Sequence, residues 1–168
     1  ILGRVWSDFY AGFIVVREWD KALSHGTLPI SVYWIHGLYG GGPAYYYFLP
    51  NLEAILLFLL CRLGFDFIMA IKIGLQIKFV IAGISMYRYA KLVTSDTKAS
   101  LVAMLTFLCT AFYVDMWHGH AHILMAVALL PLVASQLEIM LRSPSLKNAI
   151  LMGLTLMMSV ASELQITF

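Results

Sequence analysis

The chain has 168 residues, of which 61% are hydrophobic and only 12% charged, and its formal net charge is +2. Soluble domains are about 45–50% apolar and about 25% charged, and a chain of this length has too much surface to cover with so few charges. The composition therefore excludes a water-soluble globular domain and predicts an all-α, multi-pass membrane protein in contact with lipid. The small net charge excludes a nucleic-acid partner.

The first 66 residues are predicted to lie outside the membrane as a loop with short helices. Segment 1–42 carries charges, several glycines and three of the four tryptophans, which is typical of an ordered loop at the membrane surface. The apolar stretch 44–60 contains a proline, an asparagine and Glu53, which favour a re-entrant or surface helix. If this stretch spans fully instead, the first loop is cytoplasmic.

Residues 67–168 are predicted to form four transmembrane helices of one bundle. A spanning helix needs about 20 mostly apolar residues, because the hydrocarbon layer is about 30 Å thick and a helix rises about 1.5 Å per residue. The predicted spans are 67–90, 99–114, 122–141 and 146–168, with breaks at 94–97 and 143–145. The chain starts with Ile rather than Met and ends inside an apolar run, so we interpret it as a fragment that is incomplete at both ends.

Charged residues predict which connections face the cytoplasm. Cytoplasmic loops are enriched in Lys and Arg. Two connections carry such residues and are predicted to be cytoplasmic. The first is flanked by Arg88, Lys91 and Lys98, and the second is flanked by Arg142 and Lys147. The turn 115–120 between them has no Lys or Arg and is predicted to face outward, with the first loop.

Two groups on the predicted outer face are candidates for acid–base or metal chemistry. Asp8, in RVWSDFYAGF, is a candidate general base or a ligand for Mg²⁺ or Mn²⁺; the alternative is a solvated loop carboxylate or a helix cap. Asp115, His118, His120 and His122 offer ordinary metal ligands. On a helix, His118 and His122 share a face while His120 points away, so a polar interfacial helix start is the alternative.

Three charged residues within or near the predicted spans are candidates for substrate binding. An intramembrane charge is costly and usually has a partner or a function. Lys78, near the middle of the first span, is predicted to bind a lipid-linked phosphate or to pair with a carboxylate, whereas Lys72 is closer to the outer surface and is expected to snorkel. Glu163, in SELQ, is predicted to line a substrate cavity or to sit at the interface.

The order of four stretches resembles a known family. The first two, SDFYAGFIVVREWDKALSHGTLP and LYGGGPAYYYFLPNLEAILLFL, resemble the first external loop and surface helices of GT-C type membrane glycosyltransferases. IKIGLQIKFVIAGISMYRYAKL is similar to the following span. WHGHAHILMAVALLPLV and SELQ resemble late-span positions of bacterial and archaeal members, some with a 6-pyruvoyl-tetrahydropterin synthase-related membrane domain. The resemblance runs from Trp6 to the end of the chain.

The resemblance implies a GT-C-like fold in a bacterial or archaeal cell membrane and a polyprenyl-phosphate-linked sugar as donor. It also implies an acceptor on the outer face and inversion at the sugar carbon, with Asp8 as the catalytic carboxylate; Phe9 stands where many members have a second acid. The predicted substrate-binding residues are Lys78, Glu163, His120 and Glu53, and the predicted metal ligands are Asp8 and His118. Two other interpretations stay open, namely a transporter or lipid flippase using the intramembrane charges, and a non-catalytic membrane subunit.

Overall fold

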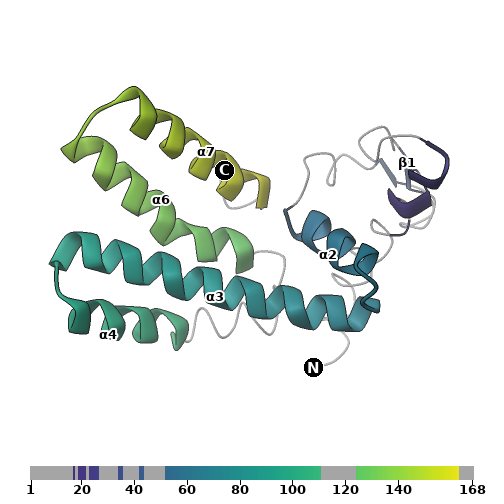
Figure 1. The fold of residues 1–168 in the computed structure, drawn as a ribbon, viewed down its shortest axis with the longest axis horizontal. Helices are drawn as coiled ribbons and strands as arrows, with labels where there is room; N and C mark the ends of the chain where they lie inside the picture. Colours follow the sequence, from purple (N-terminus) through teal and green to yellow (C-terminus); the bar gives the residue numbers. More distant parts are fainter. Residues whose placement is uncertain are drawn as a thin grey trace. The chain divides into compact units, whose positions relative to one another are not determined.

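The computed structural model describes residues 17, 19–21, 23–26, 34–35, 42–43, 52–110 and 124–162, and most of these are helical (Figure 1). Two short strands pair antiparallel, with Trp34 opposite Pro43 and Ile35 opposite Gly42. The elements in chain order are β1 (Trp34–Ile35), β2 (Gly42–Pro43), α2 (Leu52–Arg62), α3 (Phe67–Thr94), α4 (Thr97–Leu108), α6 (Leu124–Arg142) and α7 (Leu146–Ser162). The chain divides into two units, unit 1 up to Gly74 and unit 2 from Leu75.

Among the described residues, two helices are long and apolar enough to cross a membrane. They are α3, with 28 residues, and α6, with 19 residues, and their most apolar windows have mean hydropathies of 1.9 and 2.0. At about 1.5 Å per residue these helices measure about 42 Å and about 28 Å. The apolar helices α4 and α7 are shorter, with 12 and 17 residues. The tails of their predicted spans, 111–114 and 163–168, lie outside the described residues.

The connection between α3 and α4 is built by local polar contacts. Ser95 has a left-handed backbone with φ of 57°, and the Asp96 carboxylate then caps α4 by accepting from the Lys98 amide at 2.8 Å. The Lys91 Nζ donates to the Ser95 carbonyl and to the Thr97 hydroxyl, at 3.0 and 2.8 Å. These contacts satisfy backbone groups that both helix ends leave unpaired. Helix α3 therefore ends at Thr94, four residues past the end of the predicted span 67–90, and the break between α3 and α4 falls inside the predicted 94–97.

Helix α4 ends earlier than predicted. Its last residue is Leu108, and the amide of Cys109 bonds to the Leu105 carbonyl as the helix closes. The apolar run continues beyond this point, but apolar composition alone does not prolong a helix. A continuous helix over 99–114 was therefore wrong at its carboxyl end.

Helices α3, α4 and α6 share the core of unit 2. Its buried apolar residues are Ala82, Leu108, Leu124, Val127 and Ala128. A Cβ added to Gly83 of α3 would lie 3.3 Å from the Leu108 Cδ1, so this glycine lets α4 approach closely. Helices α6 and α7 form a hairpin across the 143–145 turn and lie side by side (Figure 1).

Burial changes abruptly along α6. The six residues Leu124–Leu129 are all buried, and six consecutive helical residues point in every direction around the axis, so protein surrounds this part of α6. From Leu130 onward, only Pro131 and Ser135 of α6 are buried, and the other residues are partly buried or exposed. Pro131 stands at this boundary, and because proline has no N–H it cannot bond to the Val127 carbonyl.

Unit 1 is organised around α2. Its buried residues Leu57 and Leu60 pack with Ala70 of α3. With 11 residues α2 is about 16 Å long, which is too short to cross the hydrocarbon layer. The rest of the predicted 44–60 helix, residues 44–51, lies outside the described residues.

Candidate functional site

Lys78 is the most unusual described residue. It belongs to α3, and only 1% of its surface is exposed, which makes it one of the most completely buried side chains. Residues four and seven positions later, Ala82 and Ser85, are also buried and lie on the same helix face. Ala82 packs against Leu124, Val127 and Ala128 of α6, so this face of α3 is turned toward the helix core. A cation in such surroundings loses several kcal/mol of hydration unless an anionic or polar group compensates it.

The second lysine of α3 has a different environment. Lys72 is exposed, whereas Lys78 is buried six residues later. Six residues turn a helix by about 240°, so the two side chains leave the axis in different directions. The predicted mid-helix position of Lys78 is confirmed, and the exposure of Lys72 fits a side chain that snorkels.

Several small polar residues of the described helices are buried, although many large apolar residues are exposed. The buried polar positions besides Lys78 are Ser85, Ser100, Ser135, Thr155 and Ser159. Thr155 donates its hydroxyl to the Leu151 carbonyl of its own helix at 2.8 Å. Ser135 and Thr155 lie ten residues on either side of Ser145 and thus at similar heights in the α6–α7 hairpin. We did not predict these serines and threonine, although the four-residue spacing of Thr155 and Ser159 signals one helix face.

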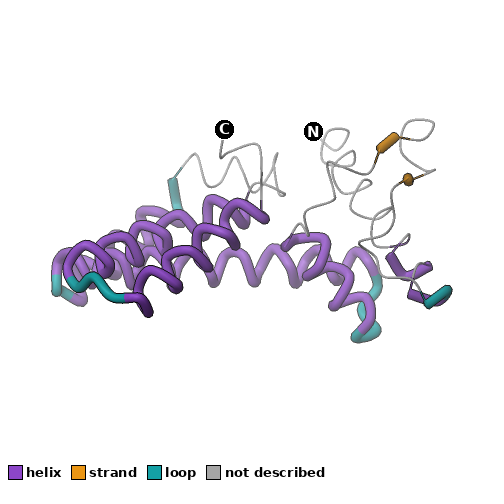
Figure 2. Tube along the Cα trace, turned by 90° about the horizontal axis from the view of Figure 1, so that it is seen from above, coloured by secondary structure: helices purple, strands orange, loops and turns teal. Residues whose placement is uncertain are grey.

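The two basic connections meet at one end of unit 2. The Arg142 Nη1 donates to the Leu92 carbonyl at 3.3 Å, and its Nε donates to the Glu138 carboxylate at 2.7 Å. The first contact joins the α6–α7 connection to the α3–α4 connection, and both lie at the same end in Figures 1 and 2. The two connections therefore lie together at one end of unit 2, and their cytoplasmic location stays a prediction.

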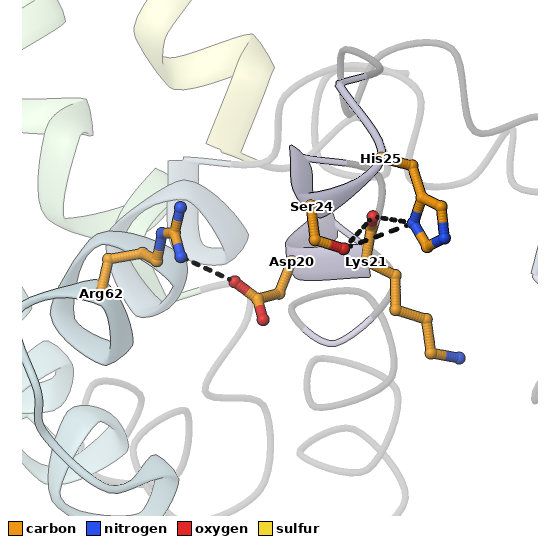
Figure 3. Close-up of polar contacts among 5 residues, drawn as sticks. All are labelled: Asp20, Lys21, Ser24, His25 and Arg62. Carbon is orange, nitrogen blue, oxygen red and sulfur yellow. Dashed lines mark hydrogen bonds and ion pairs between the residues drawn. The ribbon is translucent and has the colours of Figure 1, made fainter.

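In unit 1 a short helical segment is held against α2 (Figure 3). The Asp20 carboxylate accepts from the Arg62 guanidinium at 3.1 Å, and both side chains are exposed, so this ion pair adds at most about 1 kcal/mol. Trp19 and Phe58 meet edge to face with ring centroids 5.9 Å apart. His25 Nδ1 lies 2.7 Å from the Lys21 carbonyl.

The thiol of Cys61 also belongs to unit 1. Burial, and to a smaller extent the negative charge of Asp66, raises the pKa of this thiol. A higher pKa leaves less thiolate at neutral pH, and the thiolate is the reactive form. Cys61 therefore has the properties of a packing residue rather than those of a nucleophile.

Most other predicted site residues lie outside the described residues. They are Asp8, His118, His120 and Glu163; Glu53 belongs to α2, but its side chain is not among those described. The proposed convergence of these residues, and a Mg²⁺ or Mn²⁺ site at Asp8 and His118, stay predictions. Within 52–110, 124–162 and the shorter described stretches, no three His, Cys, Asp or Glu residues are grouped as metal ligands.

Comparison with known proteins returned no match to a family model, a curated protein or a solved structure.

Proposed function

We propose that the chain is part of a multi-pass membrane protein. The supporting observation is that its apolar helices leave many large apolar residues exposed while they bury serine, threonine and lysine side chains, as expected for helices packed in lipid. The core helix of a soluble protein is mostly buried, but only 28% of the most apolar window of α3 and 44% of that of α6 is buried. Extraction of membranes at alkaline pH tests this proposal, because a protein released with the soluble fraction would contradict it.

Lys78 then lies near the middle of the bilayer. If Tyr87 marks the inner interface, which aromatic residues favour, then Lys78 is about 14 Å deeper along α3. A hydrocarbon layer of about 30 Å has its centre at about this depth. We infer that Lys78 contributes to an electrostatic site for an anion within the helix core, because ionisable residues inside membranes mark substrate pathways as well as internal ion pairs.

We further propose that this anion is the phosphate of a polyprenyl-phosphate-linked sugar and that the complete protein is a GT-C-like glycosyltransferase. The resemblance of the first loop and its Asp8 supports the sugar-transfer chemistry, and buried Lys78 supports a negatively charged donor. In this mechanism the acceptor enters a cavity that reaches from the outer face to the depth of Lys78, and Asp8 accepts the proton of its hydroxyl. The acceptor oxygen bonds to the sugar carbon as the bond from that carbon to the phosphate oxygen breaks. Lys78 stabilises the negative charge that gathers on the departing phosphate, which is a matter of positioning and electrostatics.

The depth of Lys78 also favours a second candidate, a transporter or lipid flippase. Transporters hold substrates near the bilayer midplane. In that case the same lysine binds the phosphate while the whole lipid crosses the membrane, and no covalent bond changes. A labelled lipid-linked sugar distinguishes the two, because a transferase moves the label to an acceptor and a flippase moves it only between leaflets.

The decisive experiment compares Lys78→Met with Lys72→Met in the full-length protein, reconstituted with a polyprenyl-phosphate sugar. A hydrogen bond to a charged group contributes about 1.5–3 kcal/mol, so Lys78→Met should lower transfer by about tenfold to about 150-fold. Lys72→Met removes an exposed cation from the same helix and should leave transfer near its original rate. Lys78→Arg keeps the positive charge and should recover part of the sugar transfer that Lys78→Met loses.

Folding has to be checked separately, because removing a buried cation changes stability in either direction. Monodisperse elution and unchanged circular dichroism of Lys78→Met establish that it folds. Equal sugar transfer by a folded Lys78→Met variant and the unmodified protein would refute the donor site. Equal transfer by Asp8→Asn would refute the base assignment without affecting Lys78.

A further inference from the structure

The basic end of unit 2 is a surface with both charge and exposed apolar side chains. We define the basic end by its five cations, Arg88, Lys91, Lys98, Arg142 and Lys147. The same two segments, 86–100 and 138–150, contain only two carboxylates, Asp96 and Glu138, so the net charge there is +3. Both carboxylates are engaged, one by capping α4 and the other by Arg142.

Glu138 offsets the charge of Arg142, but the basic end as a whole stays positive, and its contacts fix the position of the Arg142 side chain. Arg142 joins the two connections through the Leu92 carbonyl, and its side chain is still 52% exposed. These two hydrogen bonds use two of the five N–H groups of the guanidinium, and no other described residue accepts from the remaining three. Lys98 and Lys147 are exposed as well, one on each connection.

Large apolar side chains stand directly beside these cations. Leu141 is 68% exposed and precedes Arg142, and Leu146 is 79% exposed and precedes Lys147. Val93 is exposed on the other connection. A partner that is only polar, such as a nucleic acid or a free anion, leaves these apolar surfaces in water. A phospholipid layer covers both, because its headgroups meet the cations and its acyl chains meet the leucines.

We propose that the basic end binds the headgroups of anionic phospholipids in the cytoplasmic leaflet, with the exposed leucines seated at the boundary of the acyl chains. This inference rests on the membrane-spanning part of the proposed function and is independent of Lys78. Its consequence is that the protein retains anionic phospholipid in preference to zwitterionic phospholipid. It also fixes the depth of α3 and α6 through the headgroup contacts at their ends.

The test uses the full-length protein reconstituted in equal parts of phosphatidylcholine and phosphatidylglycerol. The ratio of the two lipids retained after purification in mild detergent is measured by native mass spectrometry. A cation near an anionic surface contributes about fivefold in binding, so Lys98→Gln combined with Lys147→Gln should lower phosphatidylglycerol enrichment by up to about 25-fold. These two changes leave the Arg142 contact between the connections intact. Lys72→Gln removes one exposed cation from the other half of α3 and should leave enrichment unchanged.

Two outcomes overturn the inference. One is equal retention of the two lipids by the unmodified protein, or unchanged enrichment in the double variant. The other is loss of enrichment when inorganic phosphate is added at constant ionic strength, which would show a site for a free anion. Failure of the chain to enter the bilayer would contradict the membrane proposal, on which this inference rests. The sugar-transfer experiment with Lys78→Met concerns the donor site and has no bearing on lipid binding at the basic end.

Discussion

The close approach of α3 and α4 at Gly83 yields a quantitative prediction. A Cβ at this position would lie 3.3 Å from the Leu108 Cδ1 and 3.7 Å from Met104. Carbon atoms prefer separations of about 3.5–4.0 Å, so the Leu108 side chain has to move by a few tenths of an ångström to accept an alanine at position 83. Met104 already lies at an ordinary contact distance and does not have to move. Isoleucine adds three further carbons in the same restricted space. Overpacking of this kind costs about 1–3 kcal/mol.

Gly153 of α7 is the matched control, because no atom of the described residues lies within 4 Å of the position that its Cβ would take. Gly→Ile changes helix propensity equally at both sites, so the difference between Gly83→Ile and Gly153→Ile isolates the packing term. We expect the Gly83 variant to be less stable by about 1–3 kcal/mol, an increase of about fivefold to about 150-fold in the unfolding equilibrium constant.

The assay is reversible unfolding of the full-length protein in mixed micelles with increasing sodium dodecyl sulfate, followed by circular dichroism. Gly83→Ala should be close to neutral, because its gain in helix propensity of about 1 kcal/mol offsets the tighter contact. Stabilities of Gly83→Ile and Gly153→Ile that agree within about 0.5 kcal/mol would show that α4 does not pack against this glycine, and the reasoning would fail.

Three further predictions concern individual contacts. Asp96→Ala removes a helix cap and should lower the free energy of unfolding by about 1 kcal/mol in the same assay; no change would mean that water replaces the cap. In a variant lacking the other cysteine, N-ethylmaleimide should alkylate Cys61 more slowly than free thiol at neutral pH, because its pKa is raised; Asp66→Asn lowers that pKa and should speed the reaction. Trp19→Ala removes an aromatic pair with Phe58 worth about 0.5–1.5 kcal/mol and should increase protease cleavage of the adjoining segment, and unchanged cleavage would contradict this anchor.

The positions of helix breaks were largely predictable from the sequence. Serine, threonine, aspartate and proline stop helices by local hydrogen bonding or by the loss of an N–H, so the breaks near Asp96 and Pro144 follow from those residues alone. The end of α4 at Leu108 was not predictable, because the apolar residues that follow resemble those before it. The position of the two basic connections at one end agrees with the side predicted from their charge, whereas the Arg142 contact that joins them was not predicted.

The inward face of each helix was much harder to predict. In a water-soluble helix the alternation of polar and apolar residues marks the buried face. In α3 apolar residues occur on every side of the helix, so only contacts with other helices decide that Lys78 turns inward while Lys72 is exposed. Small residues such as Ala82 and Gly83 are the remaining signal, because they permit close helix packing.

The proline of α6 separates two mechanically distinct halves of that helix. The half before it is clamped by neighbouring protein on every side, and the half after it leads to Arg142. With one backbone link missing at Pro131, bending there needs less energy than elsewhere along the axis. A force on the connection after Arg142 is thus absorbed as a tilt of the second half of α6, and the first half keeps its position in the core that it shares with α3.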